Sequence, residues 1–161
     1  MPVDADAFRL LVGTFPAGVT IVTASDGSGP RGLTVSSFAS VSLDPPLVLI
    51  CVDHASDTLP AIQASGRFTV NVLTAGNGDL ALAFARKKVD KFAGLTLWPE
   101  PFGCGPILGD VACAYFACAV TRTIEAGDHV LFIASVEGGE VWPDRVPMVY
   151  WRRTFGPFTP G

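Results

Sequence analysis

Small hydroxyl side chains gather beside a hydrophobic strand pattern between residues 32 and 53. The segment GLTVSSFASVSLDPPLVLICVD places Thr34, Ser36 and Ser37 shortly before a run of branched apolar residues at 47–53. A short apolar run that follows an Asp-Pro-Pro turn signal is typical of a buried strand. Hydroxyls and backbone N–H groups beside such a sheet suit a planar ligand with polar edges and an anionic tail. The alternative is an ordinary strand–turn–strand with one face in water.

A second set of hydroxyls follows this strand. Ser56 or Asp57 is expected to cap a helix over about 58–65, and the Thr58 hydroxyl lies at the same end. The free N–H groups and partial positive charge at a helix N-terminus favour a phosphate. Helix capping alone would also explain these residues.

The basic side chains of this acidic chain cluster after a third expected helix at about 80–87. Arg86 and Lys87 are followed by Lys88 and Lys91. Cations are favourable at the C-terminus of a helix, so a solvated helix end is one interpretation. An anion clamp is the other.

The chain is short of reactive groups of its own. His54 and His129 are its two histidines, and neither lies in a motif that would activate a nucleophile or hold a metal. The four cysteines form no C-x-x-C pair and are expected to be buried free thiols, at positions 51, 104, 113 and 118. If the protein is an enzyme, a borrowed cofactor is expected to carry the reaction, with no metal.

Composition narrows the class of protein. The 161 residues are expected to form one domain, 1–161, and they are 49% hydrophobic and 16% charged with a net charge of −4. Nucleic-acid binding needs a basic surface, so it is not expected, and neither is attachment to an anionic membrane. The apolar composition predicts a homodimer. The start MPVDADAFRL resembles no secretory signal, which predicts a cytoplasmic protein.

Strand patterns dominate the chain. Besides the helices, a first helix is expected at 4–12 with Asp4 as its N-cap. Strands are expected at 19–24, 32–37, 40–43, 47–53, 67–73, 111–124, 129–137 and around 148–150, with an irregular end after Phe155. About seven short strands with few helices predict an antiparallel barrel or sandwich.

Several segments, in order, resemble one known family. They are FPAGVTIVT at 15–23, GLTVSSFASVSLDPPLV at 32–48, FTVNVL at 68–73, FARK at 84–87, DKF at 90–92 and GDH at 127–129. Together they make the chain similar to the short-chain flavin reductases, the small reductase components of two-component flavin-dependent monooxygenases. The resemblance runs from about Phe8 to Phe155.

The resemblance implies a mostly β fold, a six-stranded antiparallel split β-barrel with a few short helices, and a homodimer with the flavin near the subunit interface. It implies an NAD(P)H-dependent flavin oxidoreductase that transfers hydride from NADH or NADPH to FMN or FAD and supplies reduced flavin to a separate monooxygenase. An electron carrier or an oxidase on the same barrel, or a barrel that only binds a ligand, are the alternatives. The GDH segment favours the reductase.

The resemblance also implies roles for individual residues, none of them catalytic, because the hydride passes between two cofactors. Contacts to the flavin ring edge and ribityl–phosphate chain are expected from Thr34, Val35, Ser36 and Ser37. The ring is expected to lie against the backbone of Cys51, Val52 and Asp53, with Phe92 nearby. Phosphate contacts are expected from Ser56, Thr58, Arg86 and Lys87, and nicotinamide binding from His129. The segment Trp151-Arg152-Arg153 departs from the family pattern, which leaves its role open.

Overall fold

A curled antiparallel sheet holds most of the chain in the computed structural model, which describes residues 1–161. Its strand order is β3-β2-β6-β7-β8-β5-β4, and β1, β9 and β10 form a second, smaller sheet. The elements are α1 (Ala5–Val12), β1 (Ala17–Gly18), β2 (Thr20–Ser25), β3 (Pro30–Val35), β4 (Ala39–Ser42), β5 (Leu47–Asp53), α2 (Leu59–Ser65), β6 (Arg67–Leu73), α3 (Gly78–Ala85), β7 (Ala112–Ala126), β8 (His129–Val141), β9 (Met148–Trp151) and β10 (Thr154–Pro157).

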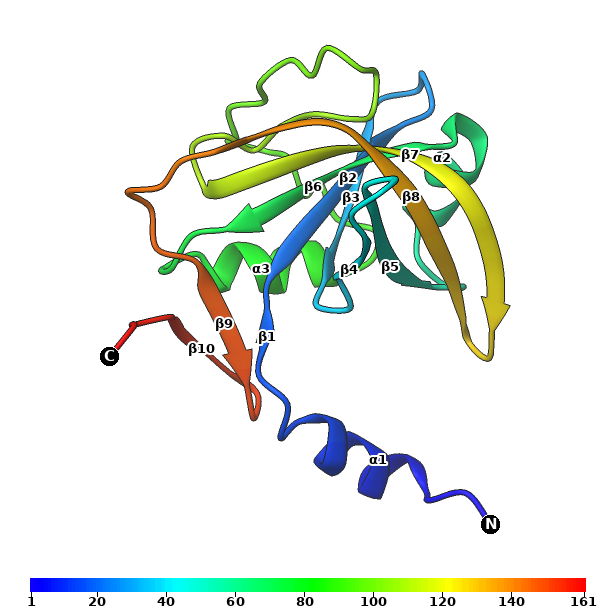
Figure 1. The fold of residues 1–161 in the computed structure, drawn as a ribbon, viewed down its shortest axis with the longest axis vertical. Helices are drawn as coiled ribbons and strands as arrows, with labels where there is room; N and C mark the ends of the chain where they lie inside the picture. Colours follow the sequence, from blue (N-terminus) through cyan, green and yellow to red (C-terminus); the bar gives the residue numbers. More distant parts are fainter.

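The mostly β prediction is confirmed, and the barrel is open between its edge strands. The sheet has seven strands rather than the expected six, because the short β4 adds to the free edge of β5. The edge strands β3 and β4 form no ladder with each other. Figure 1 shows α1 projecting away from the sheet, and β9 and β10 beside β1. No helix is long and apolar enough to span a lipid bilayer.

Strand β2 is buried on both faces, although its alternating sequence predicted a half-buried strand. Val22 and Ala24 belong to the main core inside the curled sheet, whereas Ile21 belongs to a second core that includes Phe84 of α3. The second core covers the face that the sequence pattern assigned to water. The Thr20 hydroxyl remains paired there, because it donates to the Val35 carbonyl at 2.6 Å.

Three buried polar side chains hold the long 94–111 loop against β2 and β6. The Thr23 hydroxyl donates to the Pro106 carbonyl at 2.7 Å, and the Thr69 hydroxyl donates to the Gly105 carbonyl at 2.8 Å. Asn71 accepts from the Leu108 N–H at 2.8 Å and donates to the Ile21 carbonyl at 3.2 Å. A buried loop backbone needs such partners, so these three side chains make the loop part of the folded body.

Most boundaries agree with the sequence predictions to within a few residues, and the exceptions have local causes. Asp4 caps α1, and its carboxylate accepts from the Ala7 N–H at 2.8 Å. The N-cap of α2 is Thr58 rather than Ser56 or Asp57, and its side chain makes no capping hydrogen bond. The end expected to be irregular forms β10, because it turns back and pairs with β9.

The four cysteines are free thiols, as predicted. Three of them are buried, whereas Cys51 is only partly buried. Burial raises the pKa of Cys104 and Cys113 above the usual value. These thiols therefore stay protonated and unreactive at neutral pH.

We predict that Asn71→Val destabilises the protein by about 1–3 kcal/mol, because it leaves the buried Leu108 N–H and Ile21 carbonyl with one partner fewer each. Urea unfolding followed by circular dichroism measures this change. Thr121→Val, which removes an exposed hydroxyl bonded to the Ile133 carbonyl, is the control. Equal stability of the Asn71 variant and wild type would show that the loop is held elsewhere.

Candidate functional site

A groove runs between β3 and α3 and consists of three adjoining hollows. The apolar hollow, about 180 Å³, is lined by Val19, Thr34, Ser36, Ala81, Leu82, Ala85, Tyr150 and Phe155. The cationic hollow, about 160 Å³, is lined by Leu33, Thr34, Asp53, Ser56, Asp57, Phe84, Ala85, Arg86, Lys87 and Lys91. The outer hollow, about 240 Å³, is lined by Pro30, Arg31, Gly32, Asp57, Val89, Asp90, Lys91 and Phe92. Neighbouring hollows share residues, so one elongated ligand could occupy all three.

The cationic hollow takes its positive charge from the segment after α3. Arg86 and Lys87 are exposed there, and neither takes part in any of the four ion pairs of the structure. Lys91 is the third cation, but its side chain is only 6% exposed. Two free cations beside the Ser56 hydroxyl suit a phosphate.

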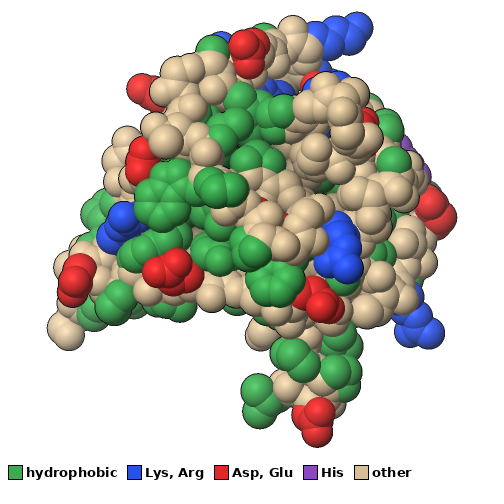
Figure 2. Space-filling model, turned by 90° about the horizontal axis from the view of Figure 1, so that it is seen from above, with side chains coloured by type: hydrophobic (Ala, Val, Ile, Leu, Met, Phe, Trp, Pro, Cys, Tyr) green, Lys and Arg blue, Asp and Glu red, His purple; other side chains and the backbone are tan.

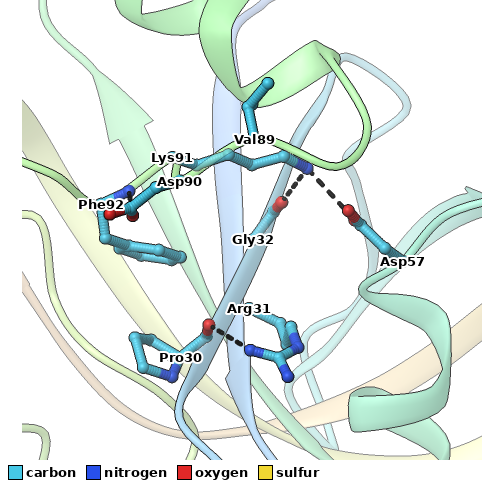
Figure 3. Close-up of a pocket in the computed structure, with 8 residues that line it drawn as sticks. All are labelled: Pro30, Arg31, Gly32, Asp57, Val89, Asp90, Lys91 and Phe92. Carbon is cyan, nitrogen blue, oxygen red and sulfur yellow. Dashed lines mark hydrogen bonds and ion pairs between the residues drawn. The ribbon is translucent and has the colours of Figure 1, made fainter.

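Lys91 clasps the cation-bearing segment to the rest of the site. Its ammonium donates to the Gly32 carbonyl of β3 at 2.8 Å and to the Asp57 carboxylate at 3.2 Å (Figure 3). The other Asp57 oxygen accepts from the Lys88 N–H at 3.4 Å. A nearly buried ammonium needs such partners, so three segments distant in sequence meet at one charge.

Asp57 is ionised because of these contacts. Partial burial raises the pKa of Asp57, but the hydrogen bonds from Lys91 and the Lys88 N–H, together with the Lys91 charge, outweigh burial. The pKa of Asp57 therefore lies below its usual value of 3.8. The pair is intact at neutral pH, and Lys91 contributes little free charge to the hollow.

Gly32 allows the aromatic wall of the groove to approach β3 closely. A Cβ at this position would lie 2.7 Å from a Phe84 ring carbon and 3.1 Å from a Phe92 ring carbon. The two rings meet edge to face with centroids 5.0 Å apart. A side chain at position 32 would push both rings away, so glycine here determines the shape of the groove.

The structure brings together many of the residues implied by the family resemblance. The cationic hollow is lined by Thr34, Asp53, Ser56, Arg86 and Lys87. Ser36 lines the apolar hollow and Phe92 lines the outer one. The Thr34 hydroxyl itself donates to the Ala81 carbonyl of α3, so it fastens the helix to β3.

Other implied residues line none of these hollows. Val35 and Val52 are in the main core, so only their backbones are free for a ligand. The Ser37 hydroxyl donates to the Cys51 carbonyl at 3.1 Å and accepts from the Cys51 N–H at 3.0 Å. Thr58 is fully buried, which does not match the expectation of a hydroxyl at the surface of a phosphate site. Its Oγ1 is the one buried side-chain polar atom without a hydrogen-bond partner.

His129 lies beside the groove rather than in it. It opens β8 and pairs in register with Asp53, which lines the cationic hollow. Opposite residues of an antiparallel pair point to the same face, so His129 lies next to the groove on the β5–β8 face. Its Nδ1 is 2.7 Å from the Asp128 carboxylate, and this hydrogen bond lowers the pKa of Asp128.

Sequence analysis missed several residues of the groove. Asp57 was considered only as a helix cap, and Lys91 only as one of several basic residues. Their pairing spans 34 positions, and no local pattern reveals a contact of that range. Tyr150 and Phe155 were also missed; their alternation as aromatic residues near the chain end is compatible with a strand and indicates no ligand.

An open antiparallel barrel with a cation-containing groove is the architecture of a protein that binds a phosphorylated ligand. The chain belongs to the flavin reductase like domain family, which matches residues 12–159. This match confirms the family resemblance found in the sequence.

Similar proteins include reductases of several bacteria. The chain is 40% identical to the actinorhodin polyketide dimerase of Streptomyces coelicolor, over 96% of this chain and 87% of that protein. It is 37% identical to the flavin reductase (NADH) of Kitasatospora aureofaciens, over 95% and 81%. It spans only 44% and 57% of two similar Rhizobium meliloti proteins, a probable flavin reductase (46% identical) and the stachydrine N-demethylase reductase subunit Stc3 (43% identical).

Solved structures agree with the family. The NADH:FAD oxidoreductase SgcE6 of Streptomyces globisporus superposes with a TM-score of 0.91 at 39% identity, covering 99% of this chain and 96% of that chain. SgcE6 in complex with NAD and FAD fragments gives a TM-score of 0.90, with 99% and 98% covered. The split-barrel architecture therefore extends over nearly the whole chain.

We predict that Lys91→Met lowers the free energy of unfolding by about 1–3 kcal/mol, because it leaves the Gly32 carbonyl and the Asp57 carboxylate without their ammonium partner. Urea unfolding at pH 7 measures the loss, and Lys88→Met, an exposed lysine of the same segment, is the control.

The Lys91–Asp57 pair also predicts a pH dependence. The folded pKa of Asp57 is lowered, so the pair stabilises the fold above the unfolded value of about 4, and this contribution is lost as the pH falls through the folded pKa. Asp57→Asn should therefore be less stable than wild type at pH 7 and equally stable at pH 2–3. A constant difference across this range would exclude the ion pair as its origin.

Proposed function

We propose that the chain is an NAD(P)H:flavin oxidoreductase that supplies reduced flavin to a separate monooxygenase. The observation that supports this most directly is the pair of free cations, Arg86 and Lys87, in a groove that also carries Ser56 and an apolar end. The naming of relatives as NADH-dependent flavin reductases, and of others as reductase components of monooxygenases, points to the same activity.

The residues of the groove fit FMN or FAD. A flavin nucleotide has an apolar ring at one end and a phosphate further along, and the apolar and cationic hollows follow each other in that order. The unpaired Thr58 Oγ1 lies two residues beyond Ser56. Buried hydroxyls are nearly always paired, so this atom is consistent with a nearby oxygen acceptor such as phosphate.

The protein residues act here by binding and orientation. A bound flavin supplies the chemistry, because it accepts a hydride from the reduced nicotinamide. Arg86 and Lys87 hold the flavin phosphate, and the aromatic wall made by Phe84 and Phe92 shapes the groove. His129 helps to hold the nicotinamide nucleotide at the neighbouring β5–β8 face, so that the two rings meet at reacting distance. No protein acid or base is required.

We predict that the purified protein oxidises NADH, followed at 340 nm, only when FMN or FAD is present. His129→Ala should raise the KM for NADH by about tenfold with little change in kcat, because it removes a binding contact of about 1.4 kcal/mol.

Arg122→Ala, which changes an exposed β7 residue outside the groove, should leave both constants unaltered. A large fall in kcat with an unchanged KM for His129→Ala would refute the binding role. Flavin binding without oxidation of NADH or NADPH would indicate an electron carrier, and absence of flavin binding would reject the whole proposal.

The same proposal includes a homodimer, for which α1 is the main support. None of its residues is buried, yet it and the following turn expose large apolar side chains, with Phe8 56% exposed, Leu10 75%, Leu11 61% and Phe15 76%. Figure 2 also shows hydrophobic side chains over much of one face of the molecule. Exposed apolar surface of this extent is typical of an interface between subunits.

We predict that the protein has twice its chain mass of 16.9 kDa in light scattering after size-exclusion chromatography. The double change Leu10→Glu and Leu11→Glu should produce monomers, because charge on α1 opposes its burial while no core contact is lost. Leu97→Glu, at an exposed leucine of the 94–111 loop, is the control and should remain dimeric. A monomeric wild type, or a double variant that stays dimeric, would contradict this role of α1.

A further inference from the structure

The groove extends past the cationic hollow into space that a flavin phosphate does not need. The outer hollow is the largest of the three, about 240 Å³, and it shares Asp57 and Lys91 with the cationic hollow. FMN ends at its phosphate. A dinucleotide continues from there with a second phosphate and a nucleoside.

We propose that the outer hollow binds the adenylate half of a dinucleotide, an inference that rests on the proposed function. The three hollows follow the order of such a ligand: an apolar end for a ring, a cationic middle for a phosphate, and an outer part for the nucleoside. The adenylate could belong to FAD or to NADH. Continuity with the flavin phosphate site favours FAD, which would fill all three hollows.

Arg31 is the residue best suited to the second phosphate or the base. Its side chain is held in place by hydrogen bonds from Nη1 to the Pro30 carbonyl and from Nη2 to the Ser28 hydroxyl, both 3.2 Å long. It takes part in none of the four ion pairs. A guanidinium has five N–H donors and a flat face that stacks on rings, so Arg31 keeps donors and a face free for a ligand.

The other walls suit a ribose and a base. Phe92 and Pro30 line one side of the outer hollow, and Asp57 and Arg31 lie on the other (Figure 3). Asp90 uses Oδ1 to accept from the Phe92 N–H at 3.2 Å, which leaves Oδ2 for ribose hydroxyls, a pairing common in nucleotide sites. Two carboxylates at this hollow disfavour an additional phosphate on the ribose, so the ligand class is an adenylate with free hydroxyls.

Calorimetric titration of the wild type and Arg31→Gln with FMN, FAD and AMP tests the proposal. We expect Arg31→Gln to raise the Kd for FAD by about tenfold, the effect of losing one charged contact, and to leave the Kd for FMN within about twofold. AMP should bind the wild type and bind the variant more weakly. Arg122→Gln, an exposed arginine outside the groove, should match the wild type throughout.

The source of the adenylate is decided by a second measurement, the KM for NADH with FMN as the acceptor. A raised KM with unchanged flavin affinities would assign the outer hollow to the adenylate of NADH. If Arg31→Gln alters neither the FAD affinity nor this KM, or weakens FMN and FAD equally, the outer hollow is not an adenylate site.

Failure of the proposed function is distinguishable from failure of this inference. Arg86→Ala should weaken FMN and FAD alike, because it acts on the phosphate that both share. If the wild type binds neither flavin, the proposed function is wrong, and the AMP titration still reports on the outer hollow by itself.

Discussion

The polar contacts between the 94–111 loop and strands β2 and β6 are the constraint on which the rest of the structure depends. Thr23, Thr69 and Asn71 present hydroxyl and amide groups on a face of the sheet that would otherwise be in water. By satisfying the loop backbone, they allow the loop to cover that face and a second core to form around Ile21 and Phe84. The groove lies at the edge of this second core, so its walls are fixed by packing that these contacts make possible.

The distribution of charge in the groove follows from burial. Lys91 is nearly buried and must be paired, so it is neutralised by Asp57 and serves as a structural link. Arg86 and Lys87 are exposed and remain free for a ligand. In a chain with a net charge of −4, a local excess of cations of this kind is selective for anions at short range, because distant charges are screened by salt. One basic cluster in the sequence therefore performs two separate tasks.

The sequence predicted elements well where the pattern was local. The apolar run at 47–53 and the alternation at 67–73 became β5 and β6 with the expected boundaries. It failed where tertiary contacts decide, as in the double-sided burial of β2 and the pairing that makes β10 a strand. Residue types and spacing alone left the phosphate and capping interpretations open. The family resemblance chose between them, and yet it could not show that the Thr58 side chain is buried or that Ser37 is occupied by Cys51.

The position of α1 connects subunit association to the ligand groove. The turn after α1 is held by the β9–β10 hairpin, because the Arg152 N–H donates to the Gly13 carbonyl at 3.2 Å and the Trp151 indole donates to the Thr14 carbonyl at 3.0 Å. The same two strands supply Tyr150 and Phe155 to the apolar hollow. A subunit that docks on α1 would therefore load the hairpin that forms one wall of the groove. Since both residues of the hairpin turn, Arg152 and Arg153, have positive φ angles, the turn is a conformation that non-glycine residues adopt only when their surroundings hold it. Contacts to α1 are part of what holds it, so ligand binding at the apolar end and assembly through α1 are expected to depend on each other.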